Sequence, residues 1–165
     1  MAYPPSMNTF LAHSLDFAGL AETILRSGNE IRFRACGNSM VPFVENGDIL
    51  SVIPMDPLKA RIGDVILHRR KNGALAAHRI QRILRDRARP SAVRTRGDAH
   101  PGDGEMIPLE AILGQVIRVQ RGNRKISLTS RSHRARAALW SAIQPAGILA
   151  RRLARKTGRA LKKLR

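Results

Sequence analysis

The chain has 165 residues, 43% of them hydrophobic, which suits one domain with a modest core. Its single cysteine, Cys36, excludes an internal disulfide and a cysteine-rich zinc module. The formal net charge of +18 is uneven, because residues 131–165 contain 11 Lys or Arg and no acid, whereas residues 1–130 contain 19 Lys or Arg and all 12 acids. We expect a globular body with a basic tail suited to an anionic partner.

The start of the chain lacks the pattern of a secretion signal. Polar residues such as Asn8, His13 and Asp16 interrupt the apolar positions there. No stretch approaches the ~20 apolar residues of a membrane-spanning helix. The sequence therefore predicts a cytoplasmic or peripheral membrane protein.

A helix is expected after an irregular lead over residues 1–13. Ser14 can cap it, and Gly28 can end it. Apolar residues recur at intervals of three and four between these positions, as on the buried face of a helix. They are Phe17, Leu20, Ala21, Ile24 and Leu25.

From Ile31 onward short β-type segments alternate with turn residues, and after Leu128 the pattern becomes helical again, from about Ser132 to Ile143. The expected strands are 31–35, 49–53, 64–69, 75–84, 92–96 and 112–119. Residues 85–90 are expected to form a charged turn that ends in proline. The predicted organisation is a lead and helix over 1–29, a mainly β domain over 30–128 and a basic helical tail over 129–165.

The clearest turn signal is Asn72-Gly73, which suits the positive backbone angles of a two-residue hairpin turn. Such a turn would pair His78 with Leu67 and His68 with Ala77. The two histidines would then lie on opposite faces of the hairpin, with His78 on the sheltered face.

Ser39 is the most prominent candidate for chemistry. It lies in the segment Gly37-Asn38-Ser39-Met40-Val41-Pro42, where glycine and proline indicate a sharp turn that exposes the hydroxyl and the neighbouring amides. Serine is a poor nucleophile until a base takes its proton. A catalytic role for Ser39 therefore requires a base elsewhere in the chain.

Several motifs follow Ser39 in a particular order. They are Gly47-Asp48, Gly63-Asp64-Val65, His78-Arg79-Ile80 and Arg96-Gly97-Asp98-Ala99. Over roughly residues 30–120 the chain thus resembles the type I signal peptidases, and its first part resembles the LexA-type self-cleaving proteins. The resemblance implies a signal peptidase/LexA-like β-fold, to which the residue pattern adds an N-terminal helix and a basic amphipathic C-terminal helical tail.

The same resemblance implies site residues. Ser39 would be the nucleophile, and His78 would be the base, as in the histidine-type signal peptidases. A histidine base normally needs a carboxylate to orient it. The candidates are Asp103, favoured by its place beyond the Gly-Asp pair, and Asp98, which could instead organise the loop.

The resemblance also bears on the oxyanion site and the substrate cleft. Many signal peptidases have a serine where this chain has Gly37, so the backbone N–H of Ser39 and the side chain of Asn38 would be the donors. Met40 and Pro42 would border the substrate. No cofactor is implied, and the spacing of the other histidines does not indicate a metal site.

The basic tail separates its leucines from its charges when residues 148–165 are drawn as a helix. This amphipathic pattern suits an anionic membrane surface, where Trp140 could add an anchor. Nucleic acid is the second possible partner, and packing of the leucines on the body is the third.

The sequence therefore predicts a serine endopeptidase that cleaves a protein or peptide precursor through a Ser39/His78 dyad. Two alternatives stay open. One is a LexA-type regulatory autoprotease, although only about 30 residues precede the first expected strand and His78 replaces the expected lysine. The other is a non-catalytic protein that binds a membrane or nucleic acid through its tail.

Overall fold

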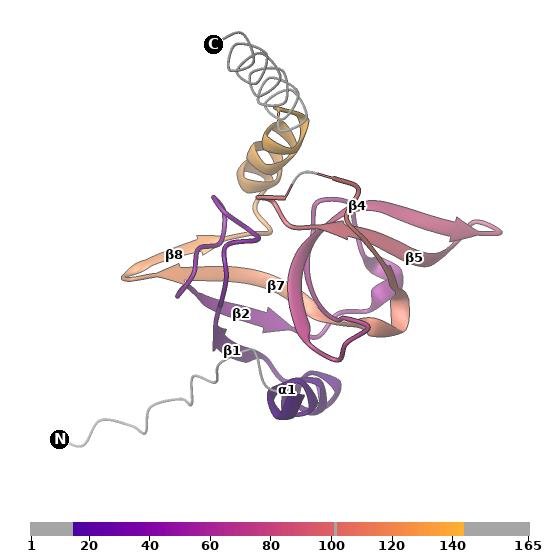
Figure 1. Cartoon of the computed structure of the whole chain (residues 1–165), viewed down its shortest axis with the longest axis horizontal. Helices are drawn as coiled ribbons and strands as arrows, with labels where there is room; N and C mark the ends of the chain where they lie inside the picture. The colour runs from indigo at the N-terminus through magenta and orange to yellow at the C-terminus, as the bar shows by residue number, and fades with distance from the viewer. Residues whose placement is uncertain (1–14, 101, 144–165) are drawn as a thin grey trace, which may run out of the picture.

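The computed structural model describes residues 15–100 and 102–143, and they form a mainly β protein (Figure 1). One N-terminal helix, α1 (Leu15–Arg26), precedes the strands, and residues 131–143 form a second helix after them. The strands are β1 (Ile31–Arg34), β2 (Ile49–Ile53), β3 (Val65–Arg69), β4 (Leu75–Asp86), β5 (Arg89–Arg96), β6 (Glu105–Pro108), β7 (Ile112–Arg121) and β8 (Arg124–Ser127). Two short 3-10 helices are η1 (Pro57–Lys59) and η2 (Leu109–Ala111).

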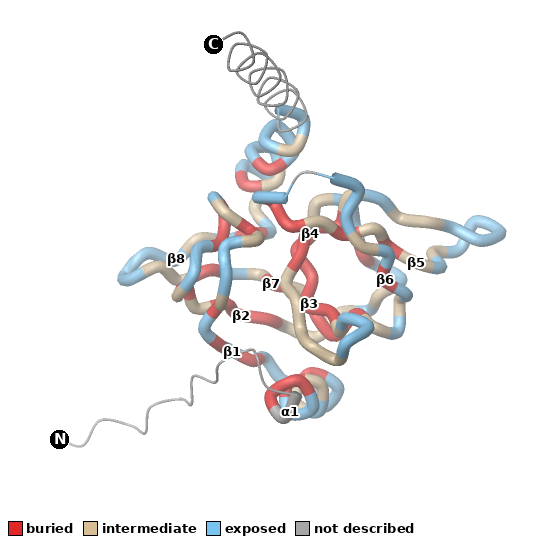
Figure 2. The backbone as a smooth tube through the Cα atoms, in the orientation of Figure 1, coloured by how far each residue is buried: buried red, intermediate tan, exposed pale blue. Residues whose placement is uncertain are grey.

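All eight strands belong to one antiparallel, curled sheet (Figure 1). The strand order is β1-β2-β7-β3-β4-β5-β6, and β8 pairs with β7. β3 therefore lies between β4 and β7, so residues from distant parts of the chain meet at the centre of the sheet. Figure 2 shows buried residues along this centre and exposed residues at the tips of the β4–β5 and β7–β8 hairpins.

The core has two parts. The larger cluster joins the apolar face of α1 to β1, β2, β3 and β7, with Phe17 packed edge-on against Phe33 at 5.3 Å between ring centroids. The smaller cluster includes Ile66, Ile80 and Val93 on the opposite side of the β3–β4–β5 segment. Burial of these side chains stabilises the sheet at roughly 1.5–3 kcal/mol for each large apolar residue.

The expected helix and the six expected strands are confirmed, and two further strands escaped the sequence pattern. α1 ends as expected, with the backbone N–H of Gly28 donating to the Leu25 carbonyl. The missed strands, β6 and β8, are each four residues long. β8 has a single apolar residue, Ile126, so no alternation marks it as a strand.

The predicted register of the β3–β4 hairpin is wrong by one residue. Gly73 adopts a φ of 82°, and its N–H donates to the Arg70 carbonyl, so the loop contains three residues instead of two. His68 consequently pairs with Ala76, and His78 pairs with Ile66. Because residues 66, 68, 76 and 78 now share one face, the two histidines lie together, and their ring centroids are 5.5 Å apart.

The expected turn over 85–90 is also shorter than predicted. Asp86 pairs with Arg89, and only Arg87 and Ala88, with φ values of 43° and 69°, form the turn. This two-residue connection lets β4 and β5 extend as a long hairpin. Pro90 lies within β5, outside the part that pairs with β6.

The helix over 131–143 contacts the body of the protein. Arg134 Nη2 donates to Asp64 Oδ1 at 2.5 Å, and Trp140 Nε1 donates to the Asp98 carbonyl at 2.9 Å. Trp140 thus binds the body and is 37% exposed, where the sequence suggested a membrane anchor. The amphipathic helix expected over 148–165 lies outside the described residues. Within the described part of the chain, no helix is long and apolar enough to cross a membrane.

Candidate active site

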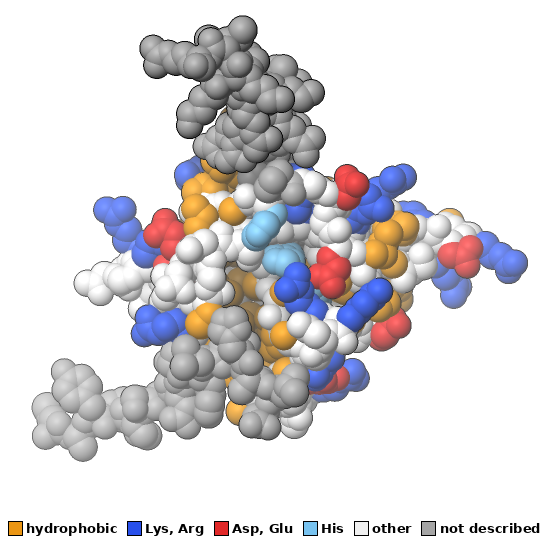
Figure 3. All heavy atoms as spheres, viewed as in Figure 1, with side chains coloured by type: hydrophobic (Ala, Val, Ile, Leu, Met, Phe, Trp, Pro, Cys, Tyr) orange, Lys and Arg blue, Asp and Glu red, His pale blue; other side chains and the backbone are white. Residues whose placement is uncertain are grey.

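A cleft of about 630 Å³ opens on one face of the sheet. Its walls come from the β1–β2 loop, the β3–β4 hairpin and the segment between β5 and β6. Figure 3 shows histidine side chains at the centre of the displayed face, with basic and acidic side chains beside them. The polar lining includes Ser39, Arg70, His78, Arg96, His100, Asp103 and Glu105, and the apolar lining includes Phe33, Met40, Val44, Leu50, Leu67 and Leu75.

Ser39 lies in the β1–β2 loop, which internal hydrogen bonds hold in shape. The N–H of Gly37 donates to Asn46 Oδ1 at 2.9 Å. The buried carboxylate of Asp48 accepts the N–H of Glu45 at 2.8 Å and the guanidinium of Arg121 at 2.8 Å. These contacts fix the loop on both sides of the serine, so its backbone is preorganised.

The local geometry at Ser39 leaves its polar groups available. The side chain is half-buried, and its hydroxyl makes no hydrogen bond to any residue that the structure describes. The same holds for the backbone N–H groups of Ser39 and Met40 within the described chain. Of the other predicted site residues, Met40 lines the cleft, whereas Asn38 and Pro42 are exposed and do not.

His78 lies on β4 and faces the same cleft as Ser39. Its side chain is buried, and its Nδ1 has no hydrogen-bond partner among the described residues. Burial, followed by the charges of His68 and Arg70, lowers the pKa of His78 from 6.5 to about 4. His78 is therefore neutral at physiological pH, the state in which imidazole accepts a proton.

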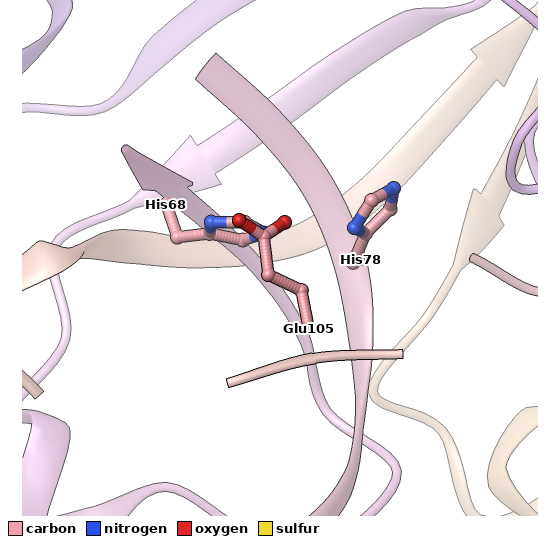
Figure 4. A group of neighbouring side chains, drawn as sticks. All are labelled: His68, His78 and Glu105. Atoms are coloured by element: carbon pink, nitrogen blue, oxygen red, sulfur yellow. The ribbon is translucent and has the colours of Figure 1, made fainter. Parts of the chain in front are cut away.

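Two further residues complete the surroundings of His78, and the sequence analysis assigned neither of them to the site. Figure 4 shows the Glu105 carboxylate directed toward the rings of His68 and His78. One ligand atom from each of the three residues lies within 4.8 Å of the others. Arg70 Nε donates to Glu105 Oε2 at 3.1 Å and holds this carboxylate in place.

The two predicted carboxylates occupy different places. Asp103 is exposed and lines the cleft. Asp98 is buried, and both of its oxygens accept hydrogen bonds from Arg79, at 2.8 and 2.7 Å. Because Arg79 follows His78 in β4, this buried ion pair positions the strand that carries His78, which agrees with the loop-organising role considered for Asp98.

The segment after β5 also contacts the serine loop directly. The N–H of Ala99 donates to the Ser39 carbonyl at 2.9 Å. A Cβ on Gly97 would lie 2.4 Å from that carbonyl oxygen, so only glycine permits this approach. The Arg96-Gly97-Asp98-Ala99 motif thus links the Ser39 loop to the strand of His78.

Three of the four Gly-Asp pairs place a buried aspartate against an arginine, whereas Asp103 of the fourth pair is exposed. Asp48 pairs with Arg121, Asp64 with Arg134 and Asp98 with Arg79. Each pair joins a loop to a strand or a helix distant in sequence. These three pairs are therefore structural supports around the cleft that Ser39 and His78 line.

Comparisons with known proteins add no family assignment, since no protein-family model and no curated protein matches the chain. The candidate site therefore depends on its own geometry. The structure brings Ser39, His78, Met40 and Asp103 to one cleft, places Asp98 beneath it, and adds His68 and Glu105.

Glu105 could have been assigned to the site from the sequence only if the register between β5 and β6 had been known. It begins β6 and pairs with Thr95, which directs its side chain to the cleft. His68 was left out because the spacing of the histidines did not indicate a metal site, and the predicted two-residue loop placed it on the face opposite His78. The two omissions have different origins, because β6 was not predicted, whereas the predicted loop length placed His68 on the wrong face.

Proposed function

We propose that this chain is a serine endopeptidase of the signal peptidase-like type, with Ser39 as nucleophile and His78 as base. The observation that carries the proposal is their convergence: the two residues are separated by a strand and a hairpin, yet they line one cleft. A neutral, buried histidine that lines the same cleft as an unbonded serine hydroxyl is the combination that nucleophilic catalysis requires. The mainly β sheet is compatible with the signal peptidase/LexA-like fold, which forms part of the proposal.

The reaction would proceed through an acyl-enzyme. His78 takes the proton of the Ser39 hydroxyl while Oγ attacks the carbonyl carbon of the scissile bond. The N–H groups of Ser39 and Met40 stabilise the negative charge on the carbonyl oxygen. His78 then gives its proton to the leaving amine, and water, activated by His78, releases the acyl group and restores Ser39.

The proposal assigns the orienting carboxylate to Glu105. Asp98 uses both oxygens to bind Arg79, so its role is structural. Among the described acids, Glu105 is the one whose charge favours the protonated form of His78 and so opposes the lowering of its pKa. Asp103, exposed at the rim of the cleft, is better placed to contact the substrate.

The cleft also indicates the kind of substrate. Its inner wall is apolar, with Phe33, Met40, Leu50 and Leu67 among the lining residues, so it suits an extended peptide with apolar side chains. The resemblance to signal peptidases further favours small residues before the scissile bond. A protein or peptide precursor is the proposed substrate class.

The function can be tested with a peptide library prepared from a digested proteome. We expect the wild-type protein to create new peptide ends that share a sequence motif, detected by mass spectrometry. The Ser39→Ala variant removes only the nucleophilic oxygen, so it should create none. Equal cleavage by both proteins would show that Ser39 is not the nucleophile, and no cleavage of the library or of intact protein precursors by either would argue against a peptidase.

The pH dependence should reflect the lowered pKa of His78. Because the base must be unprotonated, kcat/KM should fall at acidic pH with an apparent pKa near 4 instead of 6.5. Burial also lowers the pKa of His68 and of His133 to about 4, so protonation favours unfolding as the pH falls below 6.5. Initial rates after a pH jump, in buffer with a metal chelator, separate the two effects. An acid limb centred near 6.5 would contradict a buried base.

A further inference from the structure

His78 belongs to a second group of residues, whose arrangement can be explained without reference to Ser39. His68 and Glu105 lie with His78 at the meeting point of β3, β4 and β6. The side chain of His68 is completely buried, and neither of its ring nitrogens makes a hydrogen bond of good geometry to a described residue, although the backbone of Arg69 interacts weakly with the ring. A buried imidazole without a partner is costly and calls for an explanation.

A bound metal ion would satisfy these nitrogens. We propose that His68, His78 and Glu105 bind a divalent transition-metal ion, zinc above all, and that the bound ion holds the peptidase inactive by occupying its base. The regulatory part rests on the proposed function, whereas the binding part does not. Two imidazoles and one carboxylate are a ligand set that zinc uses in sites with an open fourth position.

The geometry is close to what such an ion needs. The three ligand atoms lie within 4.8 Å of one another. Ligands of a tetrahedral zinc ion lie about 3.4 Å apart, because each is about 2.0–2.1 Å from the metal. Side-chain rotations that move the ligand atoms by about 1 Å would bring them to this spacing. Figure 4 shows the carboxylate in front of the His68 ring, with the His78 ring on the other side of the view.

The surroundings support the ligands as well. Arg70 donates to Glu105 Oε2 and so supports this carboxylate, as is usual for metal-binding carboxylates, which are themselves hydrogen-bonded. Burial lowers the pKa of both histidines, so they are neutral and able to bind a metal at physiological pH. The positive charge of Arg70 weakens the attraction for a cation, and its exposed position reduces that cost by solvent screening.

Occupation of the site would have a direct consequence for His78. An imidazole nitrogen that binds a metal cannot also accept a proton from Ser39. Metal binding and catalysis would then compete for one residue, and the protein would become active only when the available metal concentration is low.

The binding experiment uses the full chain with Ser39→Ala, so that it is independent of peptidase activity. Zinc chloride is titrated near neutral pH by calorimetry, and cobalt(II) is added separately to detect tetrahedral coordination by its visible absorption. We expect one ion per chain. His68→Ala, and the milder Glu105→Gln, should weaken binding by at least about 100-fold, since even loss of a supporting residue around a metal typically costs 10–100-fold.

His133→Gln is the matched control, because His133 is also buried and lacks a partner at Nε2 but lies outside the cleft lining. It should bind zinc as the parent does. Absence of binding, or binding that is unchanged in both His68→Ala and Glu105→Gln, would overturn the site, whatever the peptidase assay shows. Folding of each variant is checked by circular dichroism, and Glu105→Gln keeps the test decisive if His68→Ala does not fold.

The regulatory part is tested on the wild-type protein with a cleaved peptide. Zinc should inhibit cleavage reversibly, and a chelator should restore it. In His68→Ala, half-inhibition should need at least about 100-fold more zinc, measured against the metal-free rate of that variant. Cleavage that is unchanged or accelerated when the site is filled would overturn the inhibitory role while leaving the metal site itself established.

Discussion

His78→Gln should reduce kcat/KM for a cleaved peptide by about 10⁴-fold, with most of the loss in kcat, because glutamine cannot take the proton of Ser39. Glutamine fills a similar volume and remains polar, so the cleft should keep its shape. The result is measured by steady-state kinetics on a peptide identified from the library, in the presence of a metal chelator. A KM close to the wild-type value would indicate that substrate binding is intact.

The matched control for this substitution is Arg82→Gln, on the same strand. Arg82 is exposed and makes no hydrogen bond within the described part of the chain. The Arg82→Gln variant should therefore cleave the peptide at the wild-type rate and have an unchanged melting temperature. If His78→Gln retained more than about a tenth of the wild-type kcat, a general base of another identity would be required, given the typical 10²–10⁴-fold contribution of such a group.

Most elements of the fold could be predicted from the sequence because they have strong local signals. The apolar periodicity predicted α1, and Phe17, Ala21 and Leu25 are buried as expected, whereas Leu20 is 41% exposed and Ile24 is half-buried. The other six strands alternate or carry continuous apolar runs between turn residues, so they were also predicted. β1 is as short as β6 and β8, but its alternating Ile-Arg-Phe-Arg pattern predicted it, whereas the position of β6 and β8 is set by their pairing with β5 and β7.

The candidate site could be predicted only in part from the sequence, for a related reason. Ser39 and His78 belong to motifs that the sequence displays locally, whereas His68 and Glu105 join them through register. One extra residue in the β3–β4 loop moves His68 to the face of His78. Likewise, the pairing of Asp98 with Arg79 depends on β4 and β5 lying side by side, which the sequence suggested without fixing the partner of either charge.

That buried pair leads to the second large effect: Asp98→Asn should lower the free energy of unfolding by about 3–5 kcal/mol. The side chains of Arg79 and Asp98 are only 2% and 0% exposed, so the substitution leaves the arginine charge buried without compensation. Urea unfolding followed by circular dichroism and by fluorescence measures the loss. Trp140, the single tryptophan, donates to the Asp98 carbonyl and therefore reports on this region.

Two comparisons make the measurement specific to the pair. Asp86→Asn removes an exposed aspartate from the end of β4 and should change the unfolding free energy by less than about 0.5 kcal/mol. The double variant Arg79→Met with Asp98→Leu removes both charges and should be more stable than Asp98→Asn, because apolar residues can replace a buried ion pair. If the double variant recovered stability but not cleavage, the pair would be assigned to positioning of His78 and the Ser39 loop. If Asp98→Asn had wild-type stability, Arg79 would have another compensating partner.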